Sequence, residues 1–428
     1  MSLQQIDPAA VQRCLAEMET HLHEQLLPFW IERSPDYDAG GFLTHFDRNG
    51  EPTGETSKTL VMQLRMIFTM ASAHRAGLGD GKCAELARHG VDFVTQHMWD
   101  DAHGGWHWIC ERDGTPTVSD KIMYGHSFGV YAMSEYGLAT GDPRGREWAE
   151  RTFDVMQRNA TDTRNGGYFE LFKPDWQLQD PGPYGGDRKS IDVHMHLMEA
   201  YTTLYELTGH HLYLRKLREV MQVLFERMLD PEHGTGIAQL ALDFTPLPAI
   251  LFKTVWGSDR DAEAGSRPLN NTSYGHNVEF AWLLLHTADI LGEPRETYRK
   301  IFEDQVRHAA DYGIDREHGG LYVEGPHDGP GQPTEKEFWQ NAECLIALLD
   351  ACLLLNDVKY WDGYVNVHRF VFDRFINREV GEWFALLERD GTVRWDYMGH
   401  AWKISYHTVR AVIQSVRRLK QLVETLET

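Results

Sequence analysis

The chain has 428 residues, 42% of them hydrophobic, and a net charge of −22. A chain of this length holds either two domains or one large domain built from repeats. The acidic balance argues against nucleic acid or an anionic membrane surface as a partner, and the lack of a long uncharged apolar run argues against a membrane span.

The start of the sequence and its cysteines predict where the protein works. The first residues, Met-Ser-Leu-Gln-Gln-Ile-Asp-Pro, lack the basic and apolar regions of a signal peptide. The five cysteines are an odd number and include no Cys-x-x-Cys pair, so neither a disulfide framework nor a zinc site is expected. We therefore expect a reduced, cytoplasmic location.

The segment from Asp7 to Trp30 is expected to form an amphipathic helix, with Asp7 as its cap and Pro8 as its first residue. From there a small turn recurs along the chain, usually Gly-Gly followed by an aromatic or apolar residue. The turns begin near residues 40, 104, 166, 234, 319 and 381. This recurrence indicates a repeat architecture.

Each turn is followed by a few alternating residues that suit a short strand or hairpin, and then by an apolar helix with a polar and aromatic start. These helix starts lie at residues 58–65, 121–128, 189–196, 273–282, 336–343 and 402–407. Several of the helices end at a glycine, such as Gly141 or Gly209. A second, amphipathic helix then follows, as from Pro143 to Asn159.

The apolar helices are hydrophobic on nearly all sides, so they must be surrounded by protein. Two concentric rings satisfy this condition, and the N-terminal helix supplies the outer helix that the last repeat lacks. The sequence therefore predicts an all-α fold, an (α/α)6 barrel of six inner and six outer helices with short β-hairpins at one end. A looser helical array or two bundles are the alternatives. No linker divides the chain, so residues 1–428 are expected to form a single catalytic domain.

Two segments, 174–188 and 243–271, exceed the repeat, and both lead into polar-headed inner helices. Long loops inside a compact domain are often lids or binding loops. Both segments are therefore expected to border the same mouth.

In this fold the polar helix starts converge on one end of the barrel axis. The residues gathered there are Arg65, Tyr124, His126, Asp192, His194, His196, His276, Glu279, Trp339, Glu343, Trp402 and His407. Histidines from different repeats can approach a ligand from different sides, and imidazole suits proton transfer at neutral pH. The tryptophans offer flat apolar walls, and the arginine offers a fixed cation.

The same cluster of residues is compatible with other functions. Three histidines with carboxylates could bind zinc, but the chain has no His-Glu-x-x-His motif, and no metal is expected. A glycoside hydrolase on the same barrel is a rival, because Asp192, Glu199, Glu279 and Glu343 could supply its two carboxyl groups. A non-catalytic sugar-binding barrel is a third reading. His126 and His194 could each be site residues or hydrogen-bonded core residues.

Four motifs follow one another along the chain: Asp192-x-His-x-His196-x-x-Glu-Ala-Tyr-Thr202, Ser273-Tyr-Gly-His276-x-x-Glu279, Lys336-x-Phe-Trp339-x-x-x-Glu343 and Trp402-Lys-x-x-Tyr-His407. Together they resemble the N-acylglucosamine 2-epimerase superfamily, which includes cellobiose 2-epimerases, mannose isomerases and mannose 2-epimerases. The resemblance covers almost the whole chain and implies an (α/α)6 barrel that isomerises sugars without a cofactor.

The resemblance also implies roles for individual residues. It gives His276 and His407 as the acid/base pair, Glu279 as the orienter of His276, and His196 as a helper in opening the sugar ring. Arg65 would bind a substrate oxygen, and Trp339 and Trp402 would be sugar platforms. We further expect the substrate to be bound by Tyr124, Asp192 and Glu343.

The expected function is 2-epimerisation or aldose–ketose isomerisation of free glucose- or mannose-type sugars through a cis-enediolate. Cellobiose 2-epimerase activity on β-1,4 disaccharides and N-acylglucosamine 2-epimerase activity are the alternatives. Cellobiose enzymes tend to have Asn where Asp192 stands and Pro-Tyr-His-Asn where Ser405-Tyr-His-Thr408 stands, and these departures argue against a disaccharide. A small sugar is the expected partner of a monomer or homodimer.

Overall fold

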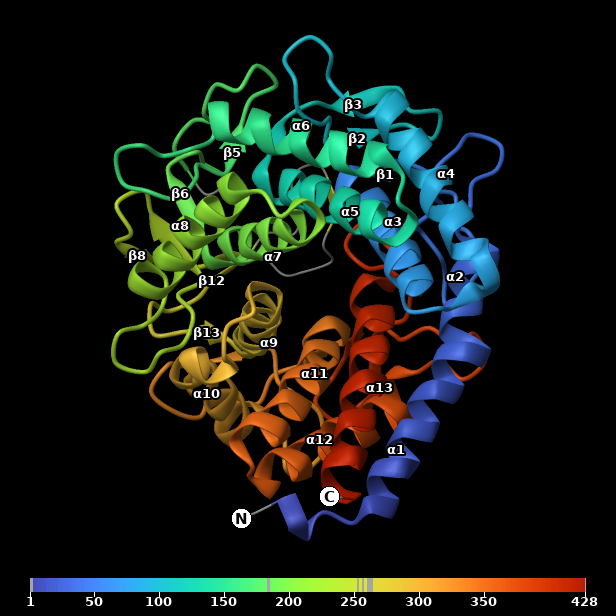
Figure 1. Ribbon diagram of the computed structural model, residues 1–428, viewed down its shortest axis with the longest axis vertical. Coiled ribbons are helices and arrows are strands. Elements are labelled where there is room, and N and C mark those ends of the chain that lie inside the picture. The colour runs from blue at the N-terminus through green and yellow to red at the C-terminus, as the bar shows by residue number, and fades with distance from the viewer. Residues whose placement is uncertain (1–2, 183–184, 252–253, 256–257, 260–264, 428) are drawn as a thin grey trace.

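The computed structural model describes residues 3–182, 185–251, 254–255, 258–259 and 265–427, and in this part of the chain the helices form two concentric rings (Figure 1). The inner ring consists of α3 (Leu60–Arg75), α5 (Met123–Thr140), α7 (Ile191–Thr208), α9 (Tyr274–Leu291), α11 (Phe338–Leu355) and α13 (Ser405–Glu427). The outer ring consists of α4 (Lys82–His97), α6 (Pro143–Asn159), α8 (His211–Arg227), α10 (Arg299–His308), α12 (Val358–Phe370) and α1 (Pro8–His21), which continues through η2 (Leu22–Leu26) into α2 (Leu27–Arg33). The predicted (α/α)6 barrel is confirmed.

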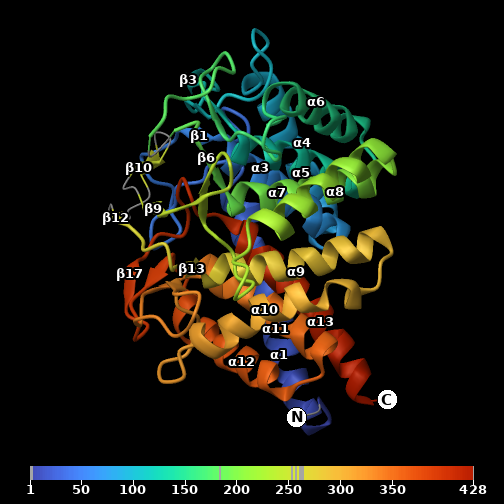
Figure 2. The ribbon, with the colours of Figure 1, turned by 90° about the vertical axis from the view of Figure 1, so that its left-hand side faces the viewer.

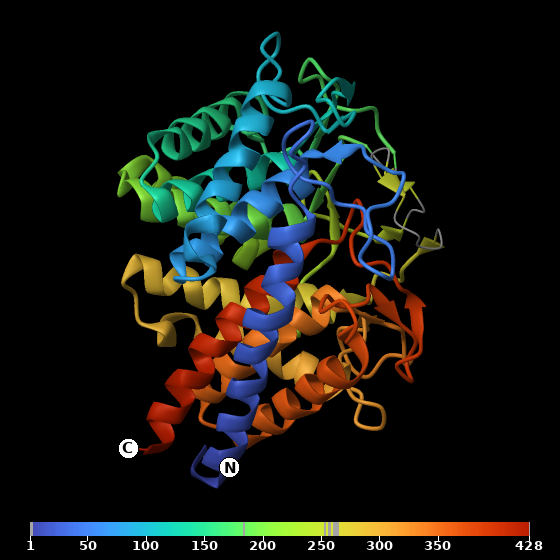
Figure 3. The same cartoon turned by 90° about the vertical axis from the view of Figure 1, so that its right-hand side faces the viewer.

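The ring closes between the last and the first repeat. Helix α13 packs against α11 on one side and α3 on the other, and α1 packs along α13. Figure 3 shows the N-terminal helix lying beside the C-terminal one. The N-terminal helix is thus the outer partner of the last inner helix, as the sequence predicts. Asp7 caps it by accepting a hydrogen bond from the backbone N–H of Ala9 at 3.0 Å.

The hydrophobic pattern separates the two rings. Helix α5 is buried continuously from Met123 to Gly137, whereas α6 buries one face, with Phe153 and Met156 inward. Helix α11 is long and apolar enough to cross a membrane by composition, but 78% of it is buried inside the protein. It is accounted for as an inner helix of the barrel.

A buried ion pair anchors each of four repeats. In each pair a lysine just before the inner helix contacts the aspartate that opens the Gly-Gly turn: Lys58–Asp36 at 3.0 Å, Lys121–Asp100 at 2.7 Å, Lys189–Asp162 at 2.7 Å and Lys336–Asp315 at 3.0 Å. In the last repeat Lys403 pairs with Glu382 at 3.2 Å, and in the fourth Thr272 occupies the lysine position. We call these six positions the anchors. Each inner helix begins two residues after its anchor.

A second contact ties each of the first five inner helices to its turn. Five residues after the anchor, a side chain accepts a hydrogen bond from a backbone N–H at or just after the turn; these residues are Gln63, His126, His194, Asn277 and Asn341. His126 Nε2 accepts from Trp106 at 3.0 Å, and His194 Nε2 accepts from Tyr168 at 3.1 Å. Both histidines are therefore hydrogen-bonded core residues and not residues that line the site.

The strands lie together on one side of the barrel, where the inner helices begin (Figure 2). They are β1 (Lys58–Thr59), β2 (Ile109–Cys110), β3 (Pro116–Val118), β4 (Lys121–Ile122), β5 (Leu171–Phe172), β6 (Arg188–Ser190), β7 (Gln239–Ala241), β8 (Pro246–Leu247), β9 (Ile250–Leu251), β10 (Thr254–Val255), β11 (Ser258–Asp259), β12 (Gly265–Ser266), β13 (Thr272–Ser273), β14 (Glu324–Gly325), β15 (Lys336–Glu337), β16 (Leu386–Leu387) and β17 (Val393–Trp395). Hairpins occur as predicted, for example β2–β3 and β16–β17. The strand before each of the first five inner helices also pairs with the next repeat, as β1 does with β2, so the strands join neighbours around the ring.

Glycines and aspartates end and start the helices as the sequence indicates. Gly141, Gly209 and Gly292 adopt left-handed backbone angles, with φ of 69°, 63° and 67°, directly after α5, α7 and α9. Asp142 then caps α6, and Pro143 is its first residue. Helices α5 and α7 therefore turn back at once into α6 and α8.

Candidate active site

A cavity of about 520 Å³ lies at the end of the barrel where the inner helices begin. It is lined by Arg65, Tyr124, Asp192, His196, His276, Glu279, Trp339, Trp402 and His407, so nine of the ten residues predicted for the site come together. The tenth, Glu343, lies directly behind the wall and contacts His407. The volume is within the usual range for small-molecule sites.

The lining follows a fixed register from the anchors. Tyr124, Asp192 and Trp339 stand three residues after their anchors, and His276 and His407 stand four after theirs. Seven residues after the anchors, about two helical turns in, come Arg65, Phe128, His196, Glu279, Glu343 and Arg410. We call these six buried residues the floor layer.

His407 is held as a neutral imidazole. Its Nδ1 lies 2.6 Å from Oε1 of Glu343, which is completely buried. Burial lowers the pKa of His407 to about 3 although Glu343 opposes the shift. Burial would raise the pKa of Glu343, but Arg410 and His407 lower it to about 2. Because an ionised carboxylate can only accept, Nδ1 carries the proton and Nε2 carries the lone pair of a general base.

His276 and His407 both lie close to the indole of Trp339. The ring centre of Trp339 is 4.8 Å from that of His276 and 5.5 Å from that of His407, so the histidine rings are no farther apart than these two distances together. Nε2 of His276 lies 3.6 Å from Oδ1 of Asp192. The pair from α9 and α13 can therefore flank one small molecule.

His196 is a different kind of histidine. Its Nδ1 contacts Oε2 of Glu199 at 2.9 Å, and its Nε2 contacts Oδ1 of Asp192 at 3.3 Å. Burial alone would lower the pKa of His196, but these two carboxylates raise it to about 10. With both nitrogens protonated at neutral pH, His196 can donate a proton but not accept one.

The raised pKa of His196 predicts a pH dependence of stability. A histidine in the unfolded chain titrates near 6.5, so the stabilisation is complete below that pH and is lost as the pH rises through about 10. Between those limits the free energy of unfolding should fall by up to about 1.4 kcal/mol per pH unit for this one proton. Urea unfolding from pH 7 to pH 10 should show this fall in the parent protein and a shallower one in His196→Gln. Parallel slopes in the two proteins would contradict the assignment.

Arg65 supplies a cation that aromatic rings hold in place. Its Cζ lies 4.6 Å from the ring centre of Phe128 and 4.7 Å from that of Tyr406, and its Nη2 donates to the Tyr124 hydroxyl at 2.6 Å. Its buried Nε has no hydrogen-bond partner, and no carboxylate of the described residues lies within ion-pair distance of Arg65. Such a guanidinium is well placed to meet negative charge that develops on a bound substrate.

Sequence reasoning missed Arg410, one turn after His407 on α13. Its Nη2 donates to Oε1 of Glu279 at 2.7 Å and to Oε1 of Glu343 at 2.8 Å, and its Nη1 donates to Oε1 of Glu199 at 2.6 Å. The spacing from the anchors could have identified Arg410, because it follows its anchor by seven residues, as Arg65 and His196 follow theirs.

Glu279 is the carboxyl group of this network that is held protonated. Burial and the charge of Glu343 raise its pKa to about 8, against the attraction of His196 and Arg410. Oε1 of Glu279 is directed to Arg410, and its role as orienter of His276 stays a prediction. Ligand atoms of Glu279, Glu343 and His407 lie close enough to share a metal ion, but the guanidinium of Arg410 already bridges the two carboxyl groups.

Strands and loops at this end of the barrel add residues to the mouth that do not follow the spacing from the anchors. Arg267, Glu324, Glu337, Arg394, Trp395 and Tyr397 also line the cavity. Of the two long segments, 243–271 contributes Ala249, Arg267 and Asn271, whereas no described residue of 174–188 is part of the lining. Trp176 of that segment instead packs against His126, with ring centres 5.2 Å apart, and donates to the carbonyl of Gly104. Among the residues that the structure describes, the expectation that both loops border the mouth therefore holds for the second segment alone.

Comparisons with known proteins agree with this geometry. Residues 40–411 match the model of the N-acylglucosamine 2-epimerase (GlcNAc 2-epimerase) family. A cellobiose 2-epimerase of Bacteroides fragilis is 27% identical over 93% of this chain and 97% of its own length. A D-mannose isomerase of Marinomonas mediterranea is 25% identical over 94% of this chain and 97% of its own. The structure of a cellobiose 2-epimerase from Spirochaeta thermophila superposes with a TM-score of 0.81 at 27% identity, covering 96% of this chain and 98% of that one.

The barrel, the histidine-lined cavity and these similarities define an enzyme of the carbohydrate epimerase and isomerase class. The chain belongs to the N-acylglucosamine 2-epimerase family.

Proposed function

We propose that this enzyme acts at C2 of free glucose- or mannose-type aldoses, as a 2-epimerase or an aldose–ketose isomerase, with residues 1–428 working as one catalytic domain. The observation that carries the proposal is that a neutral His407 and His276 both lie close to the indole of Trp339, at a cavity that also holds the Arg65 cation.

The chemistry follows from the acidity of an open-chain aldose. The ring must first open to the aldehyde: the C1–O5 bond breaks, His196, as an imidazolium, is suited to donate a proton to O5, and the proton of the C1 hydroxyl passes to solvent. The aldehyde acidifies the hydrogen at C2. One histidine of the pair removes that proton, and the electrons of the C2–H bond move to the carbonyl oxygen, giving a cis-enediolate. Arg65 stabilises the resulting oxyanion.

The return of the proton decides the product. Delivery to the opposite face of C2 by the second histidine gives the 2-epimer, and delivery to C1 gives the ketose. Trp339 and Trp402 serve as apolar platforms for the sugar. Tyr124 and Asp192 contact it, while Glu343 acts through the imidazole of His407.

The substrate is proposed as a monosaccharide. Relatives are named for cellobiose, mannose and N-acylglucosamine, so disaccharides and N-acyl sugars are the alternatives within the same chemistry. Asp192 departs from the asparagine typical of cellobiose enzymes and lies beside both His196 and His276, which supports the smaller substrate.

Incubation in heavy water tests the proposed function. Free mannose, glucose, cellobiose and N-acetylglucosamine are each incubated with the enzyme, and the products are followed by nuclear magnetic resonance. Deuterium is expected at C2 of intact sugar, together with the epimer or ketose. Glycosidic cleavage without exchange would support the hydrolase reading instead.

The proposed reaction needs no cofactor, so a chelator should leave the exchange rate unchanged.

A cytoplasmic location and a monomeric or homodimeric state are part of the same proposal. All five cysteines are buried and unbridged, which suits a reducing compartment.

A further inference from the structure

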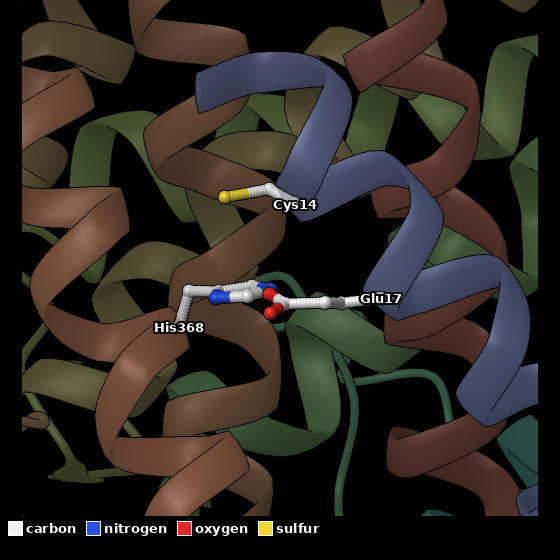
Figure 4. A group of neighbouring side chains, drawn as sticks. All are labelled: Cys14, Glu17 and His368. Atoms are coloured by element: carbon white, nitrogen blue, oxygen red, sulfur yellow. The ribbon is translucent and has the colours of Figure 1, made fainter. Parts of the chain in front are cut away.

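A second group of metal-ligating side chains lies away from the cavity, between the first helix and the last outer helix. Cys14 and Glu17 stand three residues apart on α1, and His368 faces them from α12 (Figure 4). One ligand atom from each residue lies within 4.8 Å of the other two. None of the three lines the cavity, so the proposed sugar chemistry does not use them.

His368 is the residue that points to a ligand. Its side chain is 3% exposed, and its Nε2 makes no hydrogen bond to any residue that the structure describes. The nearest recorded group is Oε2 of Glu17, 3.6 Å away. The imidazole is fixed by stacking on Phe372, with ring centres 4.4 Å apart. A buried nitrogen left unsatisfied in this way is uncommon and calls for a partner.

The donor set identifies the class of that partner. A thiolate sulfur, an imidazole nitrogen and a carboxylate oxygen together suit a borderline-soft divalent ion that prefers four ligands, which is zinc. Hard cations such as Mg²⁺ or Ca²⁺ prefer oxygen ligands alone. The side chain of Glu17 is 56% exposed, so water can reach the fourth position.

We propose that Cys14, Glu17 and His368 form a zinc site that joins α1 to α12. Binding replaces the proton on the Cys14 sulfur, which passes to solvent, and leaves the metal held by sulfur, nitrogen, carboxylate oxygen and one water. Because α1 is the helix that completes the outer ring, the metal stabilises the closure of the barrel. The site does not depend on the proposed sugar activity.

The test uses the full-length chain without a histidine tag, freed of metal by a chelator and dialysed. Zinc chloride alone is titrated calorimetrically, and a stoichiometry of one ion per chain with a rise in Tm is expected. Cobalt(II) is then added in its place. A ligand-to-metal charge-transfer band in the near ultraviolet is expected from the Cys14 thiolate.

Three variants assign the ligands. Cys14→Ser should remove the cobalt band, and Glu17→Gln and His368→Leu should each weaken zinc binding by about 100-fold or more. Glu17 is exposed, so its variant remains informative should a buried substitution impair folding. His23→Ala, an exposed histidine on the adjoining η2, is the matched control and should bind as the parent does. Unchanged affinity in Glu17→Gln, or a cobalt spectrum that keeps its thiolate band in Cys14→Ser, would overturn the proposal.

Discussion

Replacing His407 with asparagine should lower the rate of epimer or ketose formation by about 100- to 10,000-fold, the range that a positioned general base contributes. Asparagine keeps a polar side chain of similar size toward Glu343 but has no basic nitrogen. Substrate affinity should change little, because Arg65, Trp339 and Trp402 remain in the cavity. Turnover is measured by product formation, and sugar binding is measured separately by calorimetry.

Exchange of the C2 hydrogen with heavy water distinguishes a mechanism with two histidine bases from a mechanism with one. If His276 and His407 face opposite sides of C2, His407→Asn should lose exchange with one sugar epimer and keep it with the other, and His276→Asn should show the reverse. Loss of all exchange in one variant alone would indicate a single base and favour the isomerase. His318→Asn, on a turn outside the cavity, is the matched control. Retained product formation in both site variants would remove the assignment of the pair.

Arg410→Met should be among the most damaging substitutions for the stability of the fold. The substitution keeps an apolar stem but leaves the carboxyl groups of Glu199, Glu279 and Glu343 without their shared cation. Breaking a buried ionic network by removing one partner typically costs about 3–5 kcal/mol of unfolding free energy. Urea unfolding followed by circular dichroism measures the loss. Arg13→Met, at a surface arginine of α1, should change stability by less than about 0.5 kcal/mol.

Of the three carboxyl groups on Arg410, those of Glu279 and Glu343 should respond differently to neutralisation. Glu279, with a pKa raised to about 8, is already protonated at pH 7, so Glu279→Gln should change the free energy of unfolding very little. Glu343, with a pKa lowered to about 2, is ionised, so Glu343→Gln should reduce both stability and turnover. Equal losses in the two variants, or an Arg410→Met protein within about 1 kcal/mol of the parent, would show that the network is not held by this charge pattern.

Much of the fold could be predicted because it depends on patterns within one repeat. The Gly-Gly turns, the apolar inner helices and caps such as Asp7 and Asp142 are local features, and each recurs where the structure places it. The pairing of strands between neighbours could not be read in this way, because β1 meets β2 about fifty residues later in the chain. The docking of Trp176 against His126 could not be predicted either, because no periodicity specifies it.

The site was predictable to the extent that it lies at the helix starts. Nine of the predicted residues line the cavity, since the starts of the inner helices all face the same end. Arg410 was missed because it lies one turn deeper, among buried residues such as Val409 and Val412, where a charged side chain is not expected from composition. The mouth residues Arg267 and Arg394 lie outside the inner helices, so their approach to the cavity follows from tertiary structure alone.

The anchors and the floor layer have a consequence for how such an enzyme can change. Scaffold and chemistry occupy separate positions on the same helices: the anchor and the turn-binding residue hold the ring, whereas the residues three, four and seven positions after the anchor differ in type from repeat to repeat. A new specificity can therefore arise by substitutions three or four residues after an anchor, at less cost to the barrel than in the floor layer, where Arg410 holds three carboxyl groups together. Duplication of one helical pair would therefore give the barrel scaffold, and substitutions of the side chains that face the cavity would then give each enzyme its chemistry.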